Sequence, residues 1–155
     1  MYALRLWSVR HARGMAAFYR GFEGWLLRLH PVFRALGLER AERPVAAVEK
    51  AVKGLLFDCR MCGQCILTST GMSCPMNCPK TLRNGPCGGV RANGNCEVKP
   101  DMRCVWVEAF RGSEHIPGGV EAMSKVQFAV DQRCQGRSSW LRMLREKTGT
   151  SPGPT

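Results

Sequence analysis

The chain has 155 residues, whereas a (β/α)₈ barrel takes about 200 or more, so a complete flavin or nicotinamide barrel enzyme is excluded on this chain alone. Its 23 lysine and arginine residues outnumber its 12 acidic residues and give a formal net charge of +11. No stretch approaches the roughly 18 unbroken apolar residues of a membrane span, so we expect no transmembrane segment.

Residues 1–45 are expected to form a basic, amphipathic helical lead-in. Phe18 and Trp25 belong to a set of apolar residues at mostly helical spacing, with arginines between them. Pro31 predicts a break in this helix, and Gly37 predicts the end of a second short helix. Such a stripe packs inside a protein or docks on a partner subunit, and we expect no nucleic-acid binding from it.

A third helix is predicted after Pro44, from Val45 to Leu56, and it leads directly to Cys59. The apolar residues that share one face of this helix are Val45, Val48, Val52 and Leu55. We expect the helices on both sides of the cysteines to supply the apolar packing that the middle of the chain lacks.

The last third of the chain contains weaker signals. Residues 105–107 predict a short strand or the start of a helix, and residues 120–130 predict a helix. Serines at the start of residues 138–144 are typical of a helix N-cap. Residues 148–155 are expected to be a disordered tail, which leaves residues 46–147 as a cysteine-rich domain with flanking helices.

Eight of the nine cysteines lie in one window that has almost no hydrophobic periodicity and is interrupted by glycine and proline every few residues. The eight are Cys59, Cys62, Cys65, Cys74, Cys78, Cys87, Cys96 and Cys104. A loop-rich window of this length cannot bury enough apolar surface to offset its conformational entropy. We therefore expect metal ligation by these cysteines to order it, and a mainly α-helical fold with an irregular, loop-rich, metal-organised centre.

The first three cysteines of the window, at i, i+3 and i+6, favour iron–sulfur ligation over zinc. A tetrahedral zinc takes two thiolates from one knuckle, whereas a wrapping loop can reach three corners of a [4Fe–4S] cubane. Eight cysteines match two [4Fe–4S] clusters: Cys59, Cys62 and Cys65 with either Cys74 or Cys78, and the remaining one of these two with Cys87, Cys96 and Cys104. One or two Cys₄ zinc sites are the alternative, and Cys134 is expected to be a free thiol.

The cellular compartment follows from the cysteines and from the first residues. Nine is an odd number, so a fully paired disulfide framework would leave one thiol over. Residues 1–10 do not have the pattern of a secretory signal. A reducing cytoplasm is therefore the expected location, and there dense cysteines usually bind metal.

The cysteine window resembles the cysteine-rich C-terminal domain of methylenetetrahydrofolate reductases, which also occurs as a separate small subunit beside the barrel subunit in acetogenic bacteria. The likeness runs from about Ala46 to Trp140. The segments that carry it are Leu56–Cys65, Cys74–Lys80, Arg83–Gly89, Gly94–Val98, Cys104–Val107 and Gln135–Trp140.

The resemblance implies a non-catalytic subunit of an oxidoreductase, with no catalytic residue on this chain. It would dock on a barrel-type methylenetetrahydrofolate reductase subunit that holds FMN or FAD, and would pass electrons through its clusters toward that flavin in one-carbon metabolism. A further redox subunit is a possible donor. The alternative is a zinc-stapled interaction module that stabilises a folate-linked barrel enzyme. Arg60, Lys80 and Arg83 are expected to offset the negative charge of the clusters or to attract an acidic partner.

Overall fold

A computed structural model describes residues 2–149 of the chain, and these residues are mainly helical. The α-helices are α1 (Tyr2–Arg10), α2 (Ala12–Arg28), α3 (His30–Leu36), α4 (Leu38–Phe57), α5 (Val105–Glu114), α6 (Gly119–Met123) and α7 (Ser139–Thr148), and two 3₁₀ turns are η1 (Pro75–Asn77) and η2 (Gln132–Cys134). Within residues 2–149 no strand forms, and Asn95 and Arg103 make an isolated antiparallel bridge. The expected mainly α fold with a loop-rich, cysteine-rich centre is confirmed.

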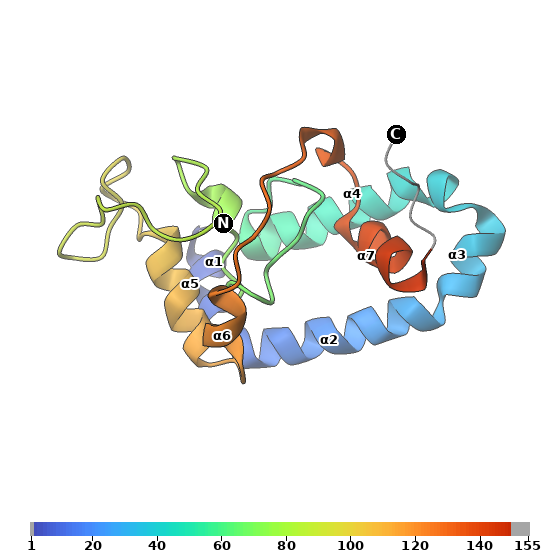
Figure 1. The fold of residues 1–155 in the computed structure, drawn as a ribbon, viewed down its shortest axis with the longest axis horizontal. Helices are drawn as coiled ribbons and strands as arrows, with labels where there is room; N and C mark the ends of the chain where they lie inside the picture. The colour runs from blue at the N-terminus through green and yellow to red at the C-terminus, as the bar shows by residue number, and fades with distance from the viewer. Residues whose placement is uncertain (1, 150–155) are drawn as a thin grey trace.

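The two long helices, α2 and α4, run in opposite directions and are joined at one end by α3 (Figure 1). α7 packs against both of them, while α1 packs against α4 and α5 at the other end. The loops of residues 78–104 project from that end, away from α3. None of the helices in the described part of the chain is long and apolar enough to cross a membrane.

The predicted break and stop in the helical lead-in are confirmed. α2 ends at Arg28, and Pro31 occupies the first turn of α3, where its missing N–H removes no helical hydrogen bond. Gly37 ends α3 with a φ of 85°, a conformation that favours glycine.

The predicted start of the third helix at Val45 is wrong, because α4 already begins at Leu38 and contains Pro44 in its interior. Contacts with α7 hold this first part of the helix in place. The carboxylate of Glu42 accepts hydrogen bonds from the backbone N–H of Ser138, at 2.6 Å, and from the guanidinium of Arg145, at 3.1 Å. These contacts offset the one backbone hydrogen bond that a proline inside a helix removes.

The predicted helix over residues 120–130 is shorter in the structure, since α6 ends at Met123. Gln127 forms two hydrogen bonds with Asn84, one from its backbone N–H and one to its carbonyl oxygen, and these fix the following segment outside a helix. Residues 105–107 begin α5, and Ser138 caps α7 through its hydroxyl, as expected. The expected start of the tail at Thr148 is wrong, because Thr148 is the last residue of α7, and residues 150–155 of the expected tail lie outside the described residues.

A buried ion pair joins α4 to the start of α7. The side chains of Glu49 and Lys53 are each 1 % exposed, with the ammonium 2.7 Å from the carboxylate. The hydroxyl of Ser138, at 2.6 Å, and the backbone N–H of Trp140, at 3.3 Å, donate to the second carboxylate oxygen of Glu49. Lys53 also donates to the Ser139 hydroxyl at 2.8 Å. Both members of the pair therefore have further hydrogen-bond partners, and its negative end lies at the N-terminus of α7, where a helix favours an anion.

Replacing Lys53 with methionine leaves the Glu49 carboxylate buried without its cation. We expect Lys53→Met to lower the free energy of unfolding by about 3–5 kcal/mol, measured by denaturant titration. Lys50→Met, on the exposed side of the same helix, is the matched control and should change little. Equal stability of the two variants would contradict a structural role for the pair.

Candidate metal centre

The eight cysteines of the window divide into two groups of four, and each group lines one cavity. Site 1 is lined by Cys59, Cys62, Cys65 and Cys74. Site 2 is lined by Cys78, Cys87, Cys96 and Cys104. The grouping places Cys74, and not Cys78, beside the first three cysteines, an assignment that spacing had left open.

The loop of site 1 turns sharply because three of its residues adopt left-handed backbone conformations. Asp58, which ends α4, has a φ of 52°, Met61 has 50° and Gly63 has 70°. In this conformation the backbone N–H of Met61 lies 3.3 Å from the Cys59 sulfur and donates to it. Backbone N–H groups directed at sulfur are typical of iron–sulfur ligand loops and help to set their potential.

Cys74 reaches site 1 because η1 is fixed to the end of α4. The side-chain amide of Asn77 donates to the backbone carbonyl of Phe57 at 2.9 Å, and both residues are buried. The preceding turn is held by the hydroxyl of Ser73, which donates to the carbonyl of Val105 at 3.0 Å. These contacts place Cys74, the residue before η1, on the wall of site 1. Cys78, the residue after η1, lines site 2.

A strap of residues 131–137 lies across the loop of site 1. Gly136 donates its backbone N–H to the carbonyl of Met61 at 2.8 Å, and the side-chain amide of Gln64 donates to the carbonyl of Asp131 at 3.1 Å. Gly63 lies so close to the strap that a β-carbon would clash with the carbonyl oxygen of Cys134. The loop conformation therefore depends on glycine at position 63.

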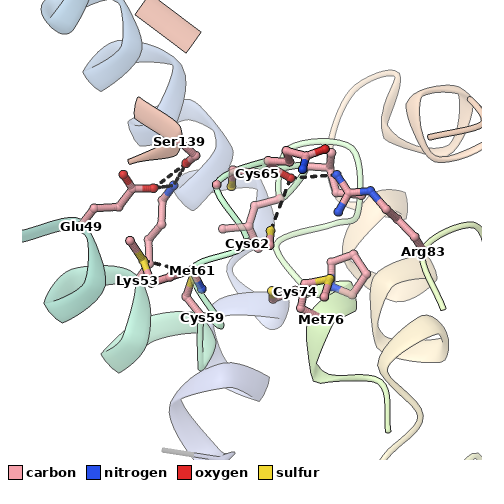
Figure 2. A pocket seen from close by; sticks show the side chains of 15 residues that line it. Glu49, Lys53, Cys59, Met61, Cys62, Cys65, Cys74, Met76, Arg83 and Ser139 are labelled. Atoms are coloured by element: carbon pink, nitrogen blue, oxygen red, sulfur yellow. Dashed lines mark hydrogen bonds and ion pairs between the residues drawn. The ribbon is translucent and has the colours of Figure 1, made fainter. Parts of the chain in front are cut away.

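Two cationic side chains border site 1 from opposite sides, Lys53 on α4 and Arg83 in the loop (Figure 2). Arg83 donates from Nη2 to the carbonyl of Gln64 at 2.8 Å. Its Nε and Nη1 are buried and have no acceptor among the described residues. Unpaired buried donors are costly, so these N–H groups at the cavity indicate a missing acceptor there.

The apolar surroundings of site 1 act on its titratable groups. Burial raises the pKa of the Cys59 thiol to about 11 and that of Cys74 to about 12, and neighbouring cysteines raise the pKa of Cys74 further. Burial alone would lower the pKa of Lys53, but the neighbouring side chains of Cys65, Tyr19 and Glu49 raise it above its ordinary value. Lys53 is therefore a permanent cation beside thiols that require a positive charge to become thiolates.

Site 2 is formed by a turn that brings Cys96 and Cys104 together. Gly94, with a φ of 79°, donates its N–H to the carbonyl of Arg91 at 2.7 Å and accepts from the N–H of Cys104 at 3.0 Å. The N–H of Cys96 donates to the carbonyl of Met102 at 2.9 Å, so the two cysteines lie on adjacent arms of one turn.

An ion pair lies beside the thiol of Cys87 at site 2. Lys80 binds the carboxylate of Glu97, and the Cys87 sulfur is 3.6 Å from that carboxylate. The hydrogen bond raises the pKa of Lys80 and lowers that of Glu97. Of the three expected cations, Arg83 thus lies at site 1 and Lys80 at site 2, whereas Arg60 is exposed and 3.8 Å from Asp58.

The ligand-type side chains of residues 2–149 form no group of three or more at coordinating spacing. Their chemistry nevertheless fits two metal centres: four cysteines line each cavity, and site 1 adds unpaired N–H donors. Cys134 belongs to neither group. It is half-buried in the strap, and its sulfur lies 3.1 Å from Nη1 of Arg142.

A family model described as "Methylene-tetrahydrofolate reductase C terminal" matches residues 38–133, more than half of the chain. The chain belongs to this family. The matched region begins with α4 and contains both cysteine sites, so the sites lie in the part that the family shares. No curated protein and no solved structure matches the chain. Helices α1–α3 and α7 lie outside the family match.

Adding a methyl group at Gly63 tests whether the strap and the loop of site 1 form one unit. We expect Gly63→Ala to lower the free energy of unfolding by about 1–3 kcal/mol, since it combines a left-handed backbone with a clash. Gly88→Ala, where a β-carbon meets open space, is the control in denaturant unfolding. A Gly63→Ala protein as stable as the control would contradict this packing.

Proposed function

We propose that this chain is an iron–sulfur electron-transfer subunit that docks on a flavin-dependent methylenetetrahydrofolate reductase barrel subunit. One [4Fe–4S] cluster would be held at site 1 and one at site 2. Membership of the reductase C-terminal family supports the link to folate chemistry. The barrel itself exceeds the length of this chain, so reduction of methylenetetrahydrofolate would take place on the partner.

The observation that carries the proposal is the division of eight thiols into two groups of four. Four thiolates also suit zinc, but two features of site 1 favour a cluster. Cys59, Cys62 and Cys65 all line the same cavity. A zinc knuckle supplies two thiolates and would leave the third cysteine unused, whereas a cluster can bind all three. The sulfide ions of a cluster would also add acceptors for the unpaired N–H groups of Arg83, beyond the thiolate sulfurs that a zinc site has as well.

The chemistry that such clusters supply is one-electron transfer. The residues of this chain would hold them, exclude water and set their potential. Met61 would donate a backbone hydrogen bond to a ligand sulfur, while Arg83 and Lys53 would place positive charge at site 1. Electrons would pass through the two sites toward FMN or FAD on the barrel subunit.

Anaerobically purified protein is expected to be brown and to contain about eight iron and eight sulfide ions per chain. Paired substitutions then test the assignment of ligands. Cys62→Ser/Cys74→Ser removes two ligands of one site and should retain about four iron ions, whereas Cys62→Ser/Cys78→Ser should lose nearly all. Cys134→Ser is the control and should retain the full content.

Two results of the metal analysis would contradict the proposal. Colourless protein with stoichiometric zinc after anaerobic purification would favour the zinc-stapled interaction module. Equal iron loss in the two paired variants would contradict the division of the cysteines into sites 1 and 2.

The charge of Arg83 provides a separate test of site 1. Arg83→Gln should lower the midpoint potential of one cluster and leave the other unchanged, because removing a cation disfavours the more negative, reduced form. Redox titration followed by electron paramagnetic resonance measures both potentials, and Lys125→Gln at an exposed position is the control. Unchanged potentials in Arg83→Gln would mean that the guanidinium does not act on a cluster.

A further inference from the structure

A groove of about 520 Å³ runs between α2 and α4. Phe18, Phe22 and Trp25 line it from α2, and Val45, Val48 and Val52 line it from α4. Phe33 of α3 and Trp140 of α7 complete the lining, and Figure 1 shows α3 joining the two long helices at one end. The lining is almost entirely apolar.

The groove is open, and its apolar side chains face solvent. Phe18 is 71 % exposed, Val48 58 % and Trp25 54 %. The same helix α4 buries the charged pair Glu49 and Lys53. α4 therefore exposes valines while it buries this charged pair, so it has an apolar face that the described residues do not cover, and a large exposed apolar patch of this kind marks an interaction site.

The shape of the groove suits a helix as its occupant. Its two walls are antiparallel helices (Figure 1), and a third helix laid into the groove between them would complete a bundle.

The charged side chains near the groove indicate which charge its occupant would carry. The acidic side chains of α2 and α4 all form ion pairs within the chain: Glu23, Glu39, Glu42 and Glu49. In contrast, Arg28, Arg34 and Arg40 lie on the elements that form the α3 end, are exposed, and have no ion pair within residues 2–149. This end therefore favours acidic residues, and a net charge of +11 disfavours a second copy of the chain.

We propose that this groove receives an apolar helix of a protein partner that carries acidic residues at the end lying against α3. The occupant would lie beside site 1, because Lys53 lines both the groove and that cavity. The inference rests on the proposed function only for the identity of the partner, the barrel subunit. The α2 wall lies outside the family match, so the groove is completed by the first helices of this chain.

A labelled model peptide tests the groove without the barrel subunit. The probe is a helical peptide of about 18 residues with a leucine and alanine face and three glutamates at one end. Fluorescence anisotropy should show that it binds the metal-loaded full chain, and that a peptide with lysines in place of the glutamates binds at least about tenfold more weakly. Val48→Glu and Phe18→Glu should each weaken binding by at least about tenfold, whereas Val126→Glu, at an exposed position outside the groove, should not.

Several outcomes would overturn the groove assignment. The assignment is wrong if the glutamate peptide does not bind, if the lysine peptide binds equally well, or if both groove variants bind the glutamate peptide as tightly as the unaltered chain does. The assignment also fails if Val48→Glu abolishes a dimer in sedimentation, or abolishes binding to phosphatidylglycerol vesicles, because the occupant is then a second copy or a membrane. If the peptide binds but the purified barrel subunit does not, the groove assignment stands and the proposed partner is wrong.

Discussion

The structure depends on bringing eight thiols, spread over 46 residues, into two groups of four. Between α4 and α5 the chain forms no regular element apart from the turn η1. Residues 61–77 bury Leu67 and Met72 in the core beside Phe57, whereas few backbone hydrogen bonds and little apolar burial hold residues 78–104. Contacts between residues far apart in sequence must do so instead. Cysteines lie at both ends of the window, after α4 and before α5, and a metal centre in each group would close the loops between them.

Helix α4 connects the parts of the molecule. It leads into site 1 at its C-terminal end, buries the pair Glu49 and Lys53 against α7, and presents its valines to the groove. Lys53 therefore belongs to three environments at once: the junction with α7, the wall of site 1 and the groove. A partner helix in the groove would lie one side chain away from the thiols of site 1, so α4 would connect the proposed docking surface with the proposed redox centre.

The cysteine window, the break at Pro31 and the cap at Ser138 could be predicted because each has a local signal. The choice between Cys74 and Cys78 could not, since both precede a proline and the deciding contact, Asn77 with Phe57, joins distant segments. The start of α4 was misplaced because Pro44 is a typical first-turn residue. The role of Lys53 could not be predicted because its burial depends on the distant segment of Ser139, although a glutamate and a lysine four residues apart inside an apolar helix are a usable signal.

Hydrogen exchange of residues 78–104 tests the central claim most directly, namely that metal ligation orders the cysteine window. The account predicts that their amides are protected in the anaerobically purified protein and exchange at nearly unprotected rates after the metal is removed, while the amides of α4 stay protected. Equal protection of residues 78–104 with and without metal would contradict it, since ordinary side-chain packing would then suffice to order these loops.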